Sequence, residues 1–221
     1  MLESEAQKPF RFYTRLHLSG LTGLKATTLE ELALHIKEVT GSCIYHHTHR
    51  FLQQHQYLSP EPPNDFAYWV ANVLGEHRLG EHLASIDTVQ FLTIRDLREK
   101  IAATIENYLQ QHPSAKQRFV NEDEAFPFIK SMSFILPTHY VAHDLKEFVE
   151  ILRKVTIDSI YFHIFEARLR LEKRTNDFSC WIEASAKDKE LANKIAHLDP
   201  YTHTLEDLRQ TIIRLIERKL K

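Results

Sequence analysis

The hydrophobic pattern of the first half of the chain recurs in the second half. The segment from Phe10 to Leu52 aligns with the segment that begins at Phe126, and after a short gap the match continues to Arg209. Matched pairs include Phe10 with Phe126, Phe12 with Phe128, Tyr45 with Tyr161, His47 with His163, Asn64 with Asn176, Asp65 with Asp177 and Trp69 with Trp181. Such a repeat is informative because it constrains the whole architecture. It predicts a mainly α-helical fold of two tandem-duplicated helical units related by a pseudo-two-fold axis.

Each copy opens with an aromatic segment in which apolar residues partly alternate with polar ones. These segments are Phe10–Leu18 and Phe126–Phe134. Apolar residues at every second position indicate a short strand or an extended arm. The two segments could pair with each other, and a fully helical fold is the alternative.

After these segments the apolar spacing changes to three and four residues, which predicts five helices in each copy. The first helices start at capping sequences, Thr28–Glu31 and Asp144–Glu147. The later helices are expected at about Cys43–Leu58, from Asp65, at Leu79–Ile86 and from Thr93, and again at about Ser159–Leu171, from Asp177, at Glu190–Leu198 and from Thr204. Asp65 and Asp177 are predicted to be N-caps. The expected organisation is a first helical repeat over residues 9–111, a linker over 112–124 and a second helical repeat over 125–221.

Composition limits the classes of function. The chain has 221 residues and a formal charge of −2, from 28 basic and 30 acidic side chains, so it has no general attraction for nucleic acid. No apolar run approaches the roughly 18 residues of a membrane span, and Met1–Lys8 has no apolar signal core. A soluble, cytoplasmic protein is expected. Cys43 and Cys180 occupy different places in the two copies, which gives no disulfide framework.

Histidine is the unusual component, with 14 residues. His46 and His49 are one helical turn apart, a spacing that is able to chelate a divalent metal. Further ligands would come from His77, Glu81, His82 or Asp65. The matched residues in the second copy are Phe162 and Phe165, so a metal site would belong to the first copy alone. The alternative is that both histidines only satisfy hydrogen bonds.

His47 and His163 lie on the apolar face of the second helix in both copies. Asp65 or Asn64 is the expected partner of His47, and Asp177 or Asn176 that of His163. A contact repeated in both copies is most simply part of the fold. The functional alternative is a cleft lined by Tyr45, His47 and Asp65 with acid–base capability. No phosphate-binding glycine loop and no serine nucleophile motif are present in the sequence.

Three segments carry a resemblance to a known family. Gly23–Ala26, Ile44–His49 and Pro60–Trp69 together resemble a bacterial and archaeal family catalogued as domain of unknown function five-seven-five-two. The resemblance extends over nearly the whole chain, including Ser159–His163 and Asp199–His203. It implies no activity and assigns no catalytic residues.

The sequence favours a non-catalytic binding or regulatory module with one specialised face on the first repeat, which would bind a small molecule or a protein. The first copy has the denser polar and aromatic set. The candidate binding residues are Tyr45, His46, His47, His49, Arg50, Asn64, Asp65 and Tyr68, with Tyr161, His163, Asn176 and Asp177 at matched positions. The alternative is a metal-binding protein or metal-dependent hydrolase that uses the His46–His49 cluster.

Overall fold

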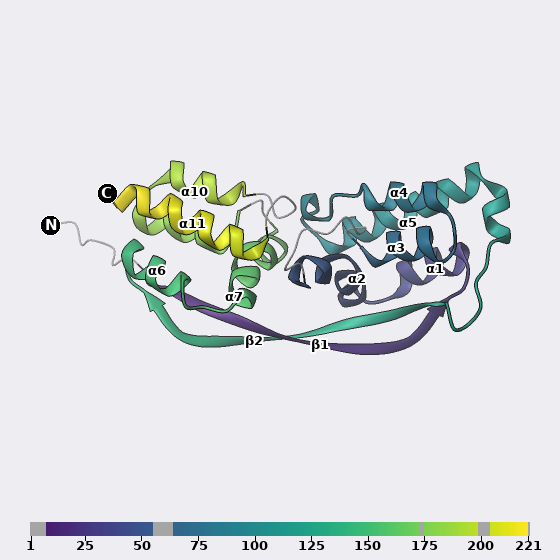
Figure 1. Cartoon of the computed structure of the whole chain (residues 1–221), viewed down its shortest axis with the longest axis horizontal. Helices are drawn as coiled ribbons and strands as arrows, with labels where there is room; N and C mark the ends of the chain where they lie inside the picture. The colour runs from purple at the N-terminus through teal and green to yellow at the C-terminus, as the bar shows by residue number, and fades with distance from the viewer. Residues whose placement is uncertain (1–7, 55–63, 173–174, 199–203, 221) are drawn as a thin grey trace. The chain divides into compact units, whose positions relative to one another are not determined.

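Two long strands form the sheet of this protein. The structure is a computed structural model that describes residues 8–54, 64–172, 175–198 and 204–220. β1 (Phe10–Ala26) and β2 (Phe126–Ala142) pair in a two-stranded sheet (Figure 1). The Thr22 hydroxyl donates to the Phe128 carbonyl at 2.7 Å, and the Thr138 hydroxyl donates to the Phe12 carbonyl at 2.7 Å. Residue numbers rise along β1 as they fall along β2, so the strands are antiparallel.

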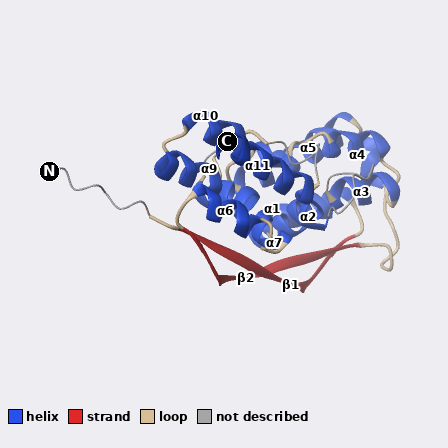
Figure 2. Ribbon diagram, turned by 60° about the vertical axis from the view of Figure 1, so that its left-hand side comes forward, coloured by secondary structure: helices blue, strands red, loops and turns tan. Residues whose placement is uncertain are grey.

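The rest of the described chain is mostly helical (Figure 2). Between the strands lie α1 (Leu29–Glu38), α2 (Gly41–Gln54), α3 (Asp65–Asn72), α4 (His77–Ala84), the 3₁₀ turn η1 (Thr88–Gln90), α5 (Ile94–Gln111) and the 3₁₀ turn η2 (Pro113–Gln117). After β2 come α6 (Leu145–Leu152), α7 (Ile157–Tyr161), the π-helical turn η3 (Phe162–Glu166), α8 (Ala167–Leu171), α9 (Asp177–Trp181), the π-helical turn η4 (Ile182–Ala186), α10 (Lys189–Ala196) and α11 (Leu205–Leu220). Helices therefore occur at the predicted positions in both halves. The predicted end of the second helix at Leu58 lies outside the described residues.

The helix starts follow from local capping chemistry. The side chains of Thr28, Thr93 and Asp144 accept hydrogen bonds from backbone amides three residues later, which confirms these caps. The predicted caps Asp65 and Asp177 are wrong, since Asn64 and Asn176 cap α3 and α9. The reason is that each cap is buried and must also donate. Asn64 Nδ2 donates to the Leu83 carbonyl and Asn176 Nδ2 to the Ile195 carbonyl, and a carboxylate has no proton to donate.

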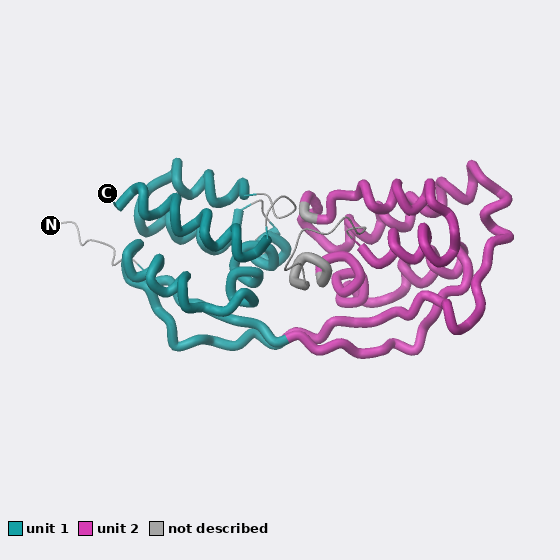
Figure 3. The backbone as a smooth tube through the Cα atoms, viewed as in Figure 1, with its two compact units in different colours: residues 1–16, 55–58, 134–221 teal, residues 17–54, 59–133 magenta. Residues whose placement is uncertain are grey.

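The chain divides into two compact units, each built from separated segments (Figure 3). Of the described residues, unit 1 contains 8–16 and those from 134 onward, and unit 2 contains 17–54 and 64–133. Each strand thus contributes residues to both units. The helices of unit 1 come from the second half of the sequence, and those of unit 2 from the first half.

In unit 1, the start of β1 packs on helices of the second half. Phe10 and Phe12 are buried, and their rings lie 5.3 Å and 5.2 Å from the ring of Phe148 on α6. Phe10 also lies 5.4 Å from Phe178 and 5.7 Å from Trp181 on α9. Aromatic rings at these separations contribute packing energy beyond their buried area.

Unit 2 has the corresponding arrangement at the start of β2. The Phe126 ring lies 5.1 Å from Phe66 and 5.9 Å from Trp69 on α3. Phe128 is fully buried and lies 5.4 Å from the ring of His35 on α1. In both units, therefore, the helices of one half of the sequence close their core with a strand from the other half.

The predicted fold class, a mainly α-helical pair of tandem-duplicated helical units, is wrong. The fold is a mixed one, because two 17-residue strands form a sheet whose ends fill both cores. The alternation of apolar and polar residues predicted extended segments that are shorter than the strands. The reason is that the central parts of the strands do not bury apolar side chains. Leu16 and Leu18 are 50% and 46% exposed, and Phe134 is 52% exposed. In the part of the chain that the structure describes, no helix has the length and apolarity to cross a membrane.

Candidate functional site

His47 connects three elements of unit 2. It is buried on α2, and its Nδ1 lies 2.8 Å from Oδ2 of Asp65 at the start of α3. Its Nε2 accepts the backbone N–H of Ile129 on β2 at 3.0 Å. A neutral imidazole has one N–H. Since Nε2 accepts, that proton is on Nδ1 and is donated to Asp65, so both ring nitrogens are used by the fold.

His163 makes the same contacts in unit 1. It lies in the π-helical turn η3, its Nδ1 donates to Asp177 Oδ2 at 2.7 Å, and its Nε2 accepts the backbone N–H of Tyr13 at 2.9 Å. The matched residues Trp69 and Trp181 also make equivalent hydrogen bonds in the two units. Trp69 Nε1 donates to the Glu124 carbonyl at 2.8 Å, and Trp181 Nε1 to the Lys8 carbonyl at 2.9 Å. We call these two sets of residues the His47 site and the His163 site. In each, the histidine and tryptophan hold the start of a strand from the other half of the sequence.

The surroundings of the two aspartates differ. The Asp65 side chain is 57% exposed, whereas that of Asp177 is 17% exposed and also binds Arg170 at 2.5 Å. Burial alone raises the pKa of Asp177, but the hydrogen bonds from His163 and Arg170 outweigh burial and hold the pKa below its ordinary value. Burial lowers the pKa of His163 despite its hydrogen bond to Asp177. His163 is therefore neutral and Asp177 ionised at neutral pH.

A pocket of about 630 Å³ opens beside the His163 site, within unit 1. Aromatic and aliphatic side chains form most of its lining, and three charged side chains complete it. The lining consists of Pro9, Phe10, Arg11, Tyr13, Ile135, Phe162, His163, Arg170, Asp177, Cys180 and Trp181. Its size and mixed lining are typical of small-molecule sites. The Arg170 guanidinium lies over the Phe162 ring, with its carbon 4.5 Å from the ring centroid.

The sequence pointed to His163 and Asp177 of this pocket but not to Arg11, Arg170 and Cys180. Arg11 and Cys180 occupy positions matched by Pro127 and Tyr68 in the other half. These differences between the halves were the available signal. It went unrecognised because the two segments that carry Arg11 and Cys180 are about 170 residues apart in the sequence, and only folding brings them together.

The predicted metal pair is placed differently from expectation. One ligand atom each from His46, His47 and Asp65 lies within 4.8 Å of the others, whereas His49 is not in this group. His49 Nδ1 lies 2.8 Å from the Thr48 hydroxyl, and its ring stacks on Tyr45 at 5.1 Å. His46 Nδ1 lies 3.1 Å from the Ser131 hydroxyl.

The tautomer of His47 argues against a metal at this group. A metal on Nδ1 would displace the proton that now faces Asp65. The neutral ring would then carry its proton on Nε2, where it would oppose the Ile129 N–H 3.0 Å away. Metal binding at His47 would therefore cost the hydrogen bond that holds β2 to α2.

The other predicted residues do not form one exposed surface. His46 and His49 are each 4% exposed and Tyr45 is buried, as is Tyr161 in unit 1. Tyr68 is 51% exposed on α3. The Arg50 side chain lies outside the described residues. Asn64 and Asn176 are buried caps, so their polar atoms serve the helices.

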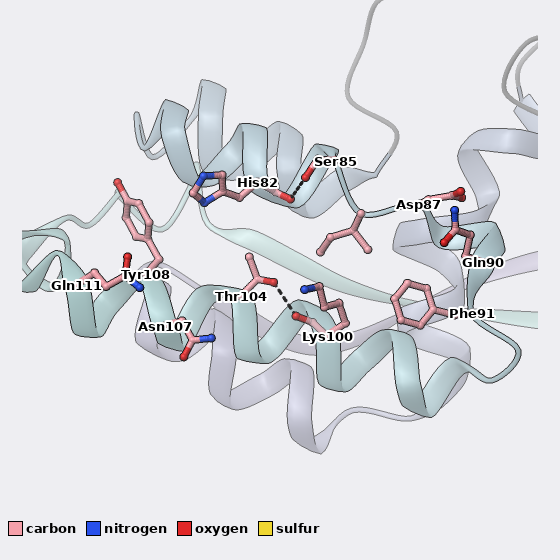
Figure 4. Close-up of a pocket in the computed structure, with 11 residues that line it drawn as sticks. His82, Ser85, Asp87, Gln90, Phe91, Lys100, Thr104, Asn107, Tyr108 and Gln111 are labelled. Carbon is pink, nitrogen blue, oxygen red and sulfur yellow. Dashed lines mark hydrogen bonds between the residues drawn. The ribbon is translucent and has the colours of Figure 1, made fainter.

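A second pocket of about 580 Å³ lies in unit 2, along α5 (Figure 4). Polar side chains line it, with Phe91 at one end. The lining consists of His82, Ser85, Ile86, Asp87, Gln90, Phe91, Lys100, Thr104, Asn107, Tyr108 and Gln111. Two of its hydroxyl groups already donate to backbone carbonyls, Ser85 to His82 and Thr104 to Lys100. From sequence, Lys100, Thr104 and Asn107 look like the solvated face of an amphipathic helix, so this pocket was not predicted.

Comparison with known proteins agrees with the resemblance read from the sequence. The family described as "Family of unknown function (DUF5752)" matches residues 7–217. No curated protein matches the chain. Among solved structures, the chain is similar to OrfY from Thermoproteus tenax, with 27% sequence identity and a TM-score of 0.80, over 99% of this chain and 98% of that one. The family resemblance is thereby confirmed: the chain belongs to the family of unknown function DUF5752.

Proposed function

We propose that this protein is a non-catalytic binding module whose ligand site is the pocket beside His163. One observation carries the proposal. This pocket combines a mostly apolar lining with the charged side chains of Arg11, Arg170 and Asp177, which is the combination that small-molecule sites use for affinity and orientation. A cytoplasmic location and a small-molecule partner are parts of the same proposal.

The absence of catalysis in this proposal rests on how the titratable groups are used. His163 donates its single ring N–H to Asp177, and its other ring nitrogen accepts the Tyr13 amide. Asp177 Oδ2 accepts from both His163 and Arg170. A general base needs a lone pair within reach of the substrate proton. The one lone pair of the neutral His163 ring is committed to the Tyr13 amide, and Oδ2 of Asp177 is committed to His163 and Arg170.

The thiol of Cys180 provides the test. Cys180 is exposed and lines the pocket, whereas burial raises the pKa of Cys43 to about 11. A thiol reagent such as 5,5′-dithiobis(2-nitrobenzoate) should therefore react with Cys180 and spare Cys43. Molecules that raise the melting temperature in a screen should slow this reaction, and Cys180→Ser should abolish it. Stabilising molecules that leave the Cys180 rate unchanged would place the ligand site elsewhere.

Metal binding is the second candidate, and the convergence of His46, His47 and Asp65 within 4.8 Å favours it. Here the test is metal analysis of the purified protein and of His46→Phe, which introduces the residue found at the matched position Phe162. Tightly bound metal that is lost in His46→Phe would support a metal-binding protein with His46 as a ligand. Substoichiometric metal, with no change in melting on chelation, would end this candidate.

A further inference from the structure

We infer that the pocket beside His163 takes a largely apolar molecule with a single negative charge, such as an aromatic carboxylate. The inference rests on the proposed function, because it names the class of ligand for that same pocket. It is carried by the aromatic lining and by the balance of charge among the lining residues.

The apolar part of the ligand is specified by the rings that line the pocket. Phe10, Phe162 and Trp181 are each less than 10% exposed, so their positions are set by packing in the core of unit 1. The rings of Phe10 and Trp181 lie 5.7 Å apart at an angle of 64°. Ile135 also lines the pocket and is 53% exposed. An apolar ligand that covers Ile135 would remove the exposed surface of this side chain from water, which is favourable at about 25 cal/mol for each Å².

The charge of the ligand follows from the two arginines. Arg11 and Arg170 carry two positive charges against the single negative charge of Asp177, because His163 is neutral. Arg170 is paired with Asp177 at 2.5 Å. Arg11 has no hydrogen bond or ion pair with any residue that the structure describes. One positive charge is thus left over, on a group able to bind a carboxylate through two parallel hydrogen bonds.

A single negative charge fits this balance better than the alternatives. A cationic ligand would face two guanidinium groups, and a dianion would exceed the unpaired charge of the pocket. A neutral ligand would leave Arg11 without a partner while covering it, which is costly for a charged group. The ligand should therefore place its apolar ring on the aromatic lining and its anionic group against Arg11.

The test compares two probes of the same shape, 2-naphthoate and its neutral amide 2-naphthamide. Isothermal titration of the full chain should show naphthoate binding roughly tenfold or more tightly than the amide, as expected for one charge-assisted pair. Arg11→Gln should remove most of this preference. Arg218→Gln, which deletes an exposed arginine on α11 of the same unit outside the pocket, should retain it. Naphthoate should also protect Cys180 from the thiol reagent.

The outcomes separate the inference from the proposed function. Equal affinity for the two probes, both protecting Cys180, would overturn the inference and leave the binding module intact. A preference for naphthoate that persists in Arg11→Gln would overturn the assignment to Arg11. If neither probe protects Cys180, the inference fails, and the proposed function fails with it only if the wider screen also finds no molecule that protects this thiol.

Discussion

The His47 and His163 sites share their hydrogen bonds and differ in what surrounds them. In both, histidine Nδ1 donates to an aspartate and Nε2 accepts an amide from a strand. The His163 site adds an arginine on the aspartate and an adjoining pocket of about 630 Å³. The His47 site has a second histidine, His46, where the other has Phe162. The comparison teaches that the shared residues hold strands in place, while the residues that differ create the candidate binding chemistry.

The largest expected effect comes from removing the two histidines. His163→Ala should lower the free energy of unfolding by about 3 kcal/mol or more, and His47→Ala by about 2 kcal/mol, since each leaves a cavity and an unpaired amide. The loss is larger at His163 because Asp177 is more buried than Asp65 and would keep its charge with one partner fewer. Urea unfolding measures both.

A histidine-to-glutamine change is the control for these variants. Glutamine can donate through its nitrogen and accept through its oxygen, as the neutral histidine does. His163→Gln and His47→Gln should each recover part of the stability lost in the alanine variants. An alanine variant with wild-type stability would refute the structural role of that histidine.

The buried N-caps Asn64 and Asn176 should respond alike to the same substitution in the two halves. Asn64→Asp and Asn176→Asp each remove the side-chain N–H that donates to a carbonyl, at Leu83 and at Ile195. Each should cost about 1–3 kcal/mol, because a carboxylate would then face a carbonyl oxygen in the interior. Thermal or urea unfolding checks the prediction. A neutral effect at either position would mean that the amide contact contributes nothing to stability.

A smaller effect is expected from pH at the His163 site. Because burial lowers the pKa of His163 in the folded protein, the unfolded chain binds this proton more readily. The stability from His163 is therefore fully present above its ordinary pKa of 6.5 and is lost as pH falls from there towards the folded value. Asp177, whose pKa is also lowered, loses its contribution as pH falls below about 3.8.

The measurement is the melting temperature between pH 7.5 and 5 for the wild type and for His163→Gln. The wild type should lose more stability on acidification than the variant, which has no imidazole at this position. Identical pH profiles would show that protonation of His163 does not oppose folding.

The smallest effect is expected from metal at the His47 site. A divalent ion bound there at 100 times its dissociation constant would stabilise the fold by about 2.7 kcal/mol. Because the His47 tautomer opposes binding, we expect adding Zn²⁺ or a chelator to leave the melting temperature of the wild type and of His46→Phe unchanged. A rise with Zn²⁺ in the wild type alone would reverse this conclusion and identify His46 as a ligand.

Part of the candidate site was predictable because its signals are local or repeated. The sequence limits the partner of His47 to Asp65 or Asn64 and that of His163 to Asp177 or Asn176, since an imidazole on an apolar helix face needs a hydrogen-bonding partner. In the structure the partner is the aspartate in both cases. Arg11 was not recognised, because it is an isolated charge in a strand and acquires its meaning only beside Arg170 and Trp181. The caps show the same limit. Both Asn and Asp suit an N-cap, and only the buried carbonyls of Leu83 and Ile195 require the amide.

By itself, the amino-acid sequence determined where the helices lie, how several of them begin and which positions recur in the two halves, because periodicity and capping act over a few residues. The tertiary structure alone decided that each strand serves both compact units, and that Phe10 and Phe12 pack on helices of the second half. Long-range pairing depends on which distant apolar faces fit together, and periodicity along a chain does not carry that information. The pocket beside His163 exists because the start of β1 packs on helices of the second half. Its lining combines residues of β1 with residues more than 100 positions away.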